Sequence, residues 1–216
     1  MDIVEFLCQH ITFDLEQGPY ITGGILTHQI AKQFYPTNWL PRDVDIICRS
    51  IEQQNKLDQI LTPLCQNRSY SQFDYFKDKP LHHTDRINWS IQDFDISSSV
   101  HDVNAWTRIN LANYTIACVA GDGKTLYTLD TTIEDIKNKI LRRAPLYHTN
   151  GIRISPGIYD LAAGPIVVKK VIDRYHRYQA RGFVDHDNIK EKLQQEISLY
   201  VVDISMAKAL LDALTN

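Results

Sequence analysis

The spacing of hydrophobic residues predicts helices along much of the chain. Apolar side chains recur every three to four positions in several segments, which is typical of a helix with one buried face. Gly18-Pro19 ends the first of these segments, Thr132 with Asp135 resembles a capping box, and Gly182 ends a later one. Helices are predicted over residues 2–16, 25–34, 51–61, 104–119, 133–143, 165–181, 186–200 and 204–214.

Other segments have the pattern of strands. Residues 43–48 alternate and then become fully apolar, which predicts a strand buried on one or both faces. Residues 69–100 are rich in aromatic and β-branched residues and predict a hairpin or meander, with its best strands at 86–89 and 91–96. Shorter strands are expected at 20–22 and 125–129. The expected class is therefore α+β: a head over residues 1–143 with a small mixed β-sheet flanked by helices, a loop or hinge over 144–164, and a short C-terminal helical tail over 165–216.

Composition agrees with a globular protein of one domain plus an appendage. The chain has 216 residues, of which 44% are hydrophobic and 23% are charged. Its sequence has no apolar span of roughly 20 residues, so no membrane partner is expected, and the first ten residues do not resemble a secretory signal. The four cysteines lie far apart with no C-x-x-C pair, which argues against a disulfide framework and favours a reducing, cytoplasmic location.

The net charge of −3 hides an asymmetry along the chain. Residues 1–136 carry a balance of −8, whereas residues 137–192 carry +7. An acidic half can hold cations and a basic half can hold phosphates, although oppositely charged surfaces can also simply pack together.

The segment with the clearest chemistry is residues 20–48. Asp43 and Asp45 are two apart on a predicted strand, so both carboxylates lie on one face and can converge on a divalent cation such as Mg²⁺ or Mn²⁺. Such a pair can also be a solvated polar face, but the apolar neighbours Val44 and Ile46 favour a central strand.

Glycines and a third carboxylate complete this candidate site. Gly23 and Gly24 precede a predicted helix, where backbone N–H groups favour phosphate and no Cβ blocks a ligand. Asp95, on a later predicted strand, is a candidate third metal ligand and base for an attacking hydroxyl, with Asp93 as the competing choice.

A basic stripe is expected on the helix over 165–181. Arg174, Arg177 and Arg181 share one face and Lys170 extends it, so the four could grip a triphosphate or a nucleic-acid backbone, or form a solvated face. Arg108 in the head is a further candidate for phosphate contact.

Three blocks in order resemble the nucleotidyltransferase superfamily, in particular the head and neck of tRNA CCA-adding enzymes and bacterial poly(A) polymerases. The first block is Gly-Gly followed by a strand with Asp-x-Asp. The second is the run ANYTIACVAGDGKTLYTLDTTIEDIKNKILR, which is similar to a family segment reading RDFTINALAY and EDL…IR. The third is RYHRYQARGF, which is similar to the family's following helix. The sequence departs from the family where Ile25-Leu26-Thr27 replaces Val-Arg-Asp and Asn113 replaces an Asp.

The resemblance implies a compact, divergent member of the kind found in viruses and phages. It implies Mg²⁺-dependent transfer of a nucleoside monophosphate from an NTP to a hydroxyl, with an RNA 3′ end as the main acceptor and a protein or small molecule as alternatives. The departures favour a second hypothesis, a nucleotide- or RNA-binding module that keeps the fold without the chemistry. A metal-dependent phosphohydrolase built on His82-His83 and His101-Asp102 is a weaker alternative, because that site needs helical ligands.

Overall fold

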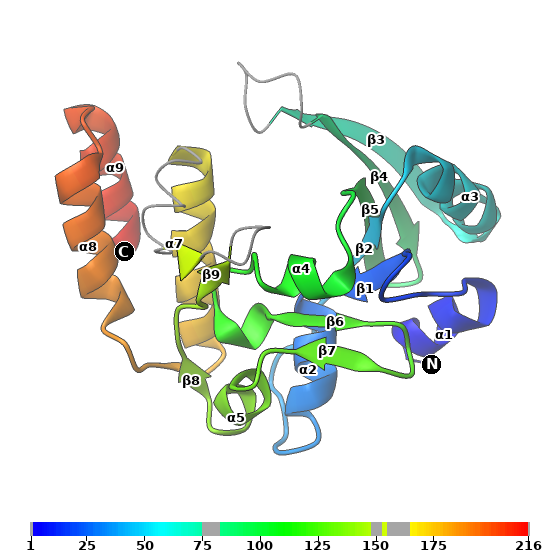
Figure 1. Cartoon of the computed structure of the whole chain (residues 1–216), viewed down its shortest axis with the longest axis horizontal. Coiled ribbons are helices and arrows are strands. Elements are labelled where there is room, and N and C mark those ends of the chain that lie inside the picture. The colour runs from blue at the N-terminus through cyan, green and yellow to red at the C-terminus, as the bar shows by residue number, and fades with distance from the viewer. Residues whose placement is uncertain (1, 75–82, 148–152, 155–164, 216) are drawn as a thin grey trace. The chain divides into compact units, whose positions relative to one another are not determined.

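The computed structural model describes residues 2–74, 83–147, 153–154 and 165–215 (Figure 1). The chain forms two compact units: residues 1–109 with 117–129, and residues 110–116 with 130–216. Residues 130–143 thus group with the C-terminal helices, although the functional division into a catalytic head and a helical tail stays a prediction. Most of the predicted hinge over 144–164 lies outside the described residues.

A seven-stranded mixed sheet is the centre of the first unit. Its strand order is β3-β4-β5-β2-β1-β6-β7, and β2 and β5 are parallel while all other neighbours are antiparallel. This sheet and its flanking helices confirm the predicted α+β class. The strands are β1 (Tyr20–Thr22), β2 (Asp43–Cys48), β3 (Asn67–Asp74), β4 (His83–Ile91), β5 (Phe94–Val100), β6 (Val119–Gly121) and β7 (Leu126–Thr128).

Two helices of this unit, α1 and α3, begin at side-chain caps that the sequence supplies. The Asp2 carboxylate accepts from the Val4 and Glu5 N–H groups at the start of α1, and the Ser50 hydroxyl accepts from the Gln53 N–H at the start of α3. The helical elements are α1 (Ile3–His10), α2 (Gly24–Ala31), α3 (Ile51–Leu61), the 3₁₀ turn η1 (Thr62–Leu64) and α4 (Ala105–Ile109).

Three predicted elements of this unit were wrong in extent, the first being the helix expected over 2–16, of which only α1 forms. The helix expected over 104–119 is only α4, followed by the 3₁₀ turn η2 (Thr115–Ala117) and β6, because residues 120–121 pair with β1 and this tertiary pairing outweighs local helical spacing. The strand expected over 91–96 is interrupted by a turn at Gln92, whose φ is +55°, so that β4 ends and β5 begins there.

The sheet has one apolar face and one polar face in the region of β2, β4 and β5. Val44 and Ile96 are fully buried on the apolar face, which α3 covers (Figure 1). The buried Trp89 indole N–H donates to the Asp58 carboxylate of α3 at 3.1 Å, which satisfies the polar atom of this large core side chain. The alternate residues of the same strands point to the opposite face, so the polar side chains there are brought together by the core packing.

The described part of the second unit consists mainly of three long helices, with the shorter α5 and small strand pairs. Its core includes two tyrosines of α7, Tyr175 and Tyr178, together with Phe183. Burial raises the pKa of Tyr175 to about 12. Gly182 has a φ of +86° just after α7, which confirms the predicted end of that helix. The elements are α5 (Thr132–Lys137), β8 (Ile140–Leu141), β9 (Leu146–Tyr147), β10 (Arg153–Ile154), α7 (Pro165–Ala180), β11 (Val184–Asp185), α8 (Ile189–Tyr200) and α9 (Ile204–Thr215).

The predicted capping box of α5 was wrong. Thr131 is the residue before the helix, and its side chain makes no capping hydrogen bond. The Thr132 hydroxyl instead donates to the Thr115 carbonyl, and the buried Asp135 carboxylate accepts from the Thr115 hydroxyl at 2.6 Å and from Arg142. Both side chains therefore tie α5 to another segment of the same unit. In the described part of the chain, no helix combines the length and the apolar character that crossing a bilayer requires.

Candidate active site

Asp43 and Asp45 lie on the polar face of β2, two residues apart. Val44 between them is fully buried against the opposite side, so the strand is central and the carboxylates share one face, as the pattern predicted. Asp43 is exposed at the start of the strand, whereas 41% of the Asp45 side chain is exposed.

Asp95 lies beside Asp43 on the neighbouring strand. β2 and β5 run parallel, and their register pairs Asp43 with Asp95 and Asp45 with Ser97. Paired residues of adjacent strands point to the same face at a strand separation of about 4.8 Å. Asp93 lies in the turn between β4 and β5, outside the ladder that aligns Asp95 with β2. This arrangement favours Asp95 over Asp93 as the third carboxylate.

Gly23 brings the end of β1 close to Asp45. Its backbone has φ +92° and ψ −159°, a region open almost only to glycine. A Cβ built on Gly23 would stand 3.0 Å from the Asp45 Oδ2 atom. The Gly24 backbone has no such restriction, and a Cβ there would meet only the Pro41 Cβ at 3.9 Å. The two glycines of the motif therefore have different roles.

An arginine that sequence analysis did not identify contacts the Asp45 carboxylate. The Arg86 Nη2 atom, on β4, donates to Asp45 Oδ1 at 2.9 Å and to the Ser97 hydroxyl at 2.5 Å. The Ser97 hydroxyl donates to the same Asp45 oxygen at 2.8 Å. The alternation of polar Arg86 and Asn88 with apolar Ile87 is the signal that could have placed Arg86 on the polar face.

Asp43, Asp95 and Arg86 line a shallow depression of about 410 Å³ on the polar face of the sheet. The register places its side chains in rows that cross the strands, because Asn67 pairs with Ser90 and Ser90 pairs with Asp95. The depression joins the carboxylates to a neutral hydroxyl- and amide-bearing surface. It is lined by Asp43, Asn67, Ser69, Arg86, Asn88, Ser90, Asp95 and Ser97.

The donor set of the depression fits a hard divalent cation. Asp43 and Asp95 are adjacent and exposed, and Mg²⁺ is usually held by one or two carboxylates together with phosphate oxygens and water. Among the described residues, no three His, Cys, Asp or Glu side chains are grouped to hold a metal without other ligands. Two carboxylates with a triphosphate suffice for the usual coordination of Mg²⁺, so the residues fit a cation that arrives with a nucleotide.

The predicted phosphate-binding residues divide between the two units. Arg108 is in the first unit, near Tyr20 and at the last turn of α4, and its buried Nε atom has no hydrogen-bond partner among the described residues. In the second unit, Arg174 is exposed on α7 and donates to the Asn113 side-chain oxygen at 2.7 Å. Asn113 is the residue that replaces an Asp in the family segment.

The other members of the basic stripe also lie on or next to α7. Lys170 is partly buried and Arg177 is exposed. The Arg181 guanidinium lies 5.7 Å from the centre of the Tyr178 ring, a cation–π distance. Lys170, Arg174 and Arg177 therefore lie on one helix with Arg181 just after its end, and their common role as a ligand-binding stripe stays a prediction.

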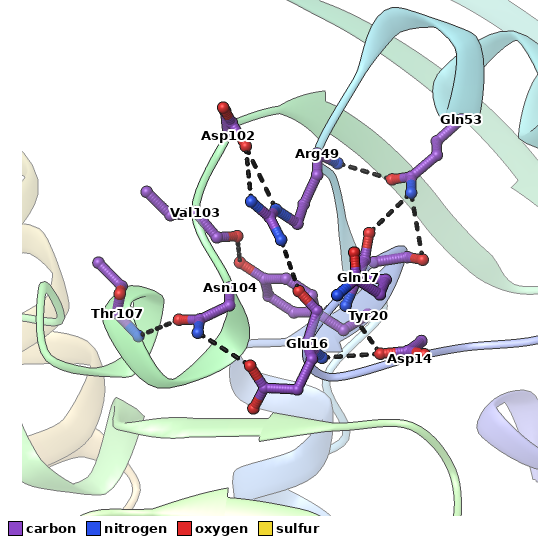
Figure 2. A network of polar contacts seen from close by, with 11 residues as sticks. Asp14, Glu16, Gln17, Tyr20, Arg49, Gln53, Asp102, Val103, Asn104 and Thr107 are labelled. Atoms are coloured by element: carbon purple, nitrogen blue, oxygen red, sulfur yellow. Dashed lines mark hydrogen bonds and ion pairs between the residues drawn. The ribbon is translucent and has the colours of Figure 1, made fainter.

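A separate polar network in the first unit holds loops at the end of β2 (Figure 2). Arg49 donates to the Asp102 carboxylate at 2.8 Å and to the Glu16 carbonyl at 2.7 Å. The Tyr20 hydroxyl donates to the Val103 carbonyl, and burial raises its pKa. Asp102 therefore has a structural ion pair, which weakens the phosphohydrolase alternative; His82 lies outside the described residues.

Comparison with known proteins shows the fold. No family model and no curated protein sequence matches the chain. Solved structures do match it, among them a tRNA-processing enzyme in an apo form, with 17% identity and a TM-score of 0.51 over 83% of this chain and 42% of that one. The Thermotoga maritima CCA-adding enzyme complexed with tRNA has 13% identity and a TM-score of 0.52 over 91% of this chain and 42% of its own. The Bacillus stearothermophilus CCA-adding enzyme in complex with CTP has 13% identity and a TM-score of 0.52 over 98% of this chain and 46% of its own.

These similarities establish a nucleotidyltransferase-like fold, in agreement with the resemblance found in the sequence. The chain spans less than half the length of each of these solved structures.

Proposed function

We propose that the chain is a metal-dependent nucleotidyltransferase, which transfers a nucleoside monophosphate from an NTP to a hydroxyl acceptor and releases pyrophosphate. The observation that carries the proposal is the alignment of Asp43 and Asp45 with Asp95 on one face of a nucleotidyltransferase-like sheet. An RNA 3′ end is the proposed acceptor, because two of the structurally similar proteins are CCA-adding enzymes and one of them is complexed with tRNA.

In this proposal, Asp43, Asp45 and Asp95 hold Mg²⁺ or Mn²⁺, which neutralises phosphate charge when bound. Asp95 accepts the proton of the acceptor hydroxyl as its oxygen attacks the α-phosphorus. A bond forms between that oxygen and the α-phosphorus, and the bond from the α-phosphorus to the bridging oxygen breaks, so pyrophosphate leaves. Backbone N–H groups at the start of α2 bind the triphosphate, and Gly23 leaves room for it.

The basic residues have a proposed part in substrate binding. Arg108, Lys170, Arg174, Arg177 and Arg181 bind phosphate oxygens of the NTP or of the RNA backbone in this proposal. Cations are needed because a triphosphate would otherwise meet the carboxylates of an acidic surface.

One observation favours a second candidate function, a nucleotide-binding module without catalysis. Arg86 already pairs with Asp45, and such a pair can replace the charge of a metal permanently. The two functions differ in a single outcome, which is whether the labelled α-phosphate is transferred from the NTP to an acceptor.

The test is incubation of the chain with each α-³²P-labelled NTP, Mg²⁺ and total RNA, followed by analysis of where the label goes. We expect labelled RNA and released pyrophosphate from the wild type. We expect Asp95→Ala to abolish transfer while NTP binding persists, and Asp93→Ala, two residues away in the turn, to serve as the matched control that retains transfer. NTP binding without any pyrophosphate release by the wild type would support the binding module. An inactive Asp93→Ala beside an active Asp95→Ala would contradict the proposed base.

A further inference from the structure

Arg86 supplies the positive charge of the depression. Of the described residues that line it, Arg86 alone is a cation, and Asp43 and Asp95 are the lining carboxylates. Its register partner on β5 is Ser99, so its side chain reaches diagonally across β5 to contact Asp45 on β2. Only a long side chain can span this separation of two strands, about 10 Å.

One oxygen of the Asp45 carboxylate already accepts as many hydrogen bonds as it can. Asp45 Oδ1 accepts from Arg86 at 2.9 Å and from the Ser97 hydroxyl at 2.8 Å. A carboxylate oxygen offers about two lone-pair positions, so Oδ1 has none left for a cation. The other oxygen, Oδ2, is the atom that a Cβ on Gly23 would approach most closely.

A divalent cation and the Arg86 guanidinium therefore compete for Asp45. Both are positively charged and both bind the Asp45 carboxylate. If they bound it at the same time, the two positive charges would lie close together and repel each other. A phosphate group changes the balance, because it offers the guanidinium a bidentate partner of at least equal strength.

We propose that Arg86 is a nucleotide-dependent charge switch, which rests on the proposed function. Without nucleotide, Arg86 neutralises Asp45 and keeps the affinity of the site for free divalent cations low. When the NTP binds with its cation, Arg86 leaves Asp45 and donates to a phosphate oxygen, and Asp45 becomes a metal ligand. Arg86 thus couples metal binding to nucleotide binding through its alternating contacts with Asp45 and phosphate, and this coupling acts equally in both directions.

The chain offers a well-matched control in Arg68. Arg68 lies on β3, next to β4, and pairs with Asp58 at 2.7 Å on the opposite side of the same sheet. The Arg86 and Arg68 side chains are 35% and 38% exposed, so replacing either removes one similarly exposed cation and one ion pair. Only Arg86 contacts the candidate site.

The experiment is a titration of the full chain with Mn²⁺ alone, in which electron paramagnetic resonance measures free Mn²⁺. Exposed ion pairs are weak, so we expect Arg86→Gln to tighten Mn²⁺ binding only about two- to fivefold. Arg86→Lys, which keeps the charge, should bind Mn²⁺ as weakly as the wild type, and Arg68→Gln should not differ from it. Thermal melting establishes that every variant is folded.

The second measurement is calorimetric titration with the Mn²⁺ complex of α,β-methylene ATP and, separately, of the CTP analogue. Because Arg86 gains a charge-assisted bond to phosphate, Arg86→Gln should weaken binding of the preferred analogue about ten- to hundredfold. This loss is opposite in sign to the gain in affinity for Mn²⁺ alone. A general structural defect would weaken both ligands together.

The outcomes separate this proposal from the proposed function. Unchanged or weaker Mn²⁺ binding by Arg86→Gln overturns the switch, as does normal analogue binding by that variant. A wild type that binds neither analogue overturns the proposed function as well. If the wild type transfers nucleotide normally and Arg86→Gln binds Mn²⁺ with the same affinity as the wild type, the switch alone is overturned.

Discussion

The two glycines at the start of α2 should respond in opposite ways to the same substitution. Gly23 has φ +92° and ψ −159°, whereas Gly24 is the first residue of the helix and its φ is not positive. Alanine adds one Cβ at each position. Gly24→Ala is therefore a matched control for Gly23→Ala, one residue away in the same motif.

The magnitude of the Gly23 effect follows from the backbone and from Asp45. A non-glycine residue held in this region costs about 1–3 kcal/mol. The new Cβ would also stand 3.0 Å from Asp45 Oδ2, and hydrogen bonds from Arg86 and Ser97 restrain that carboxylate from moving away. Gly24→Ala restricts the unfolded chain without strain and should stabilise the protein by about 0.4–1 kcal/mol. The two variants should thus differ by about 1.5–4 kcal/mol.

Tryptophan fluorescence can follow the relevant unit by itself. All three tryptophans, Trp39, Trp89 and Trp106, belong to the first unit. For a chain of this length, each kcal/mol shifts the melting temperature by roughly 2–4 °C. We expect Gly23→Ala to melt several degrees below the wild type and Gly24→Ala slightly above it. Equal melting temperatures for the two variants would refute the argument from the Gly23 backbone and from its approach to Asp45.

Three further predictions concern charged groups. Asp45→Asn should abolish Mg²⁺ binding in the presence of NTP in a calorimetric titration, with little loss of stability, and unchanged metal affinity would contradict the site. Arg177→Ala should weaken NTP binding about ten- to hundredfold, whereas Lys190→Ala should not; a loss of RNA affinity alone would instead assign the stripe to nucleic acid. A hydrogen bond from Arg68 lowers the pKa of Asp58, so the ionised Asp58 carboxylate stabilises the folded state above about pH 4. This stabilisation is lost as the pH falls below that value. Urea unfolding should therefore show Asp58→Asn destabilised at pH 7 and closer to the wild type at pH 3.

The parts of the site that sequence analysis found are those with a local signal. Alternation on residues 43–48 places Asp43 and Asp45 on one face of a strand, and a strand has only two faces to choose from. Asp95 also alternates with apolar neighbours on a predicted strand, but Asp93 shares its face, and the pattern does not give the direction of that strand relative to β2. The structure pairs them in parallel, with β3 and β4 between them in the chain but not in the sheet.

The features that sequence analysis missed depend on contacts distant in the chain. Arg86 is 41 residues from Asp45, and no local pattern links a strand arginine to a particular carboxylate. The capping box failed for the same reason, since Asp135 instead accepts from Thr115, 20 residues earlier. Both cases involve polar side chains whose partner is chosen by tertiary packing, which spacing along one segment does not reveal.

The alignment of the three carboxylates is a consequence of the core on the other face of the sheet. Val44 pairs with Ile96, and Ile96 pairs with Trp89, which is 1% exposed under α3. A slip of β5 by one residue would bring Asp95 to the apolar face and put an uncompensated carboxylate in the core. The apolar residues therefore fix the register, and the register places Asp95 beside Asp43. Substitutions that loosen this core should consequently impair the site through its geometry, even though none of the core residues touches the depression.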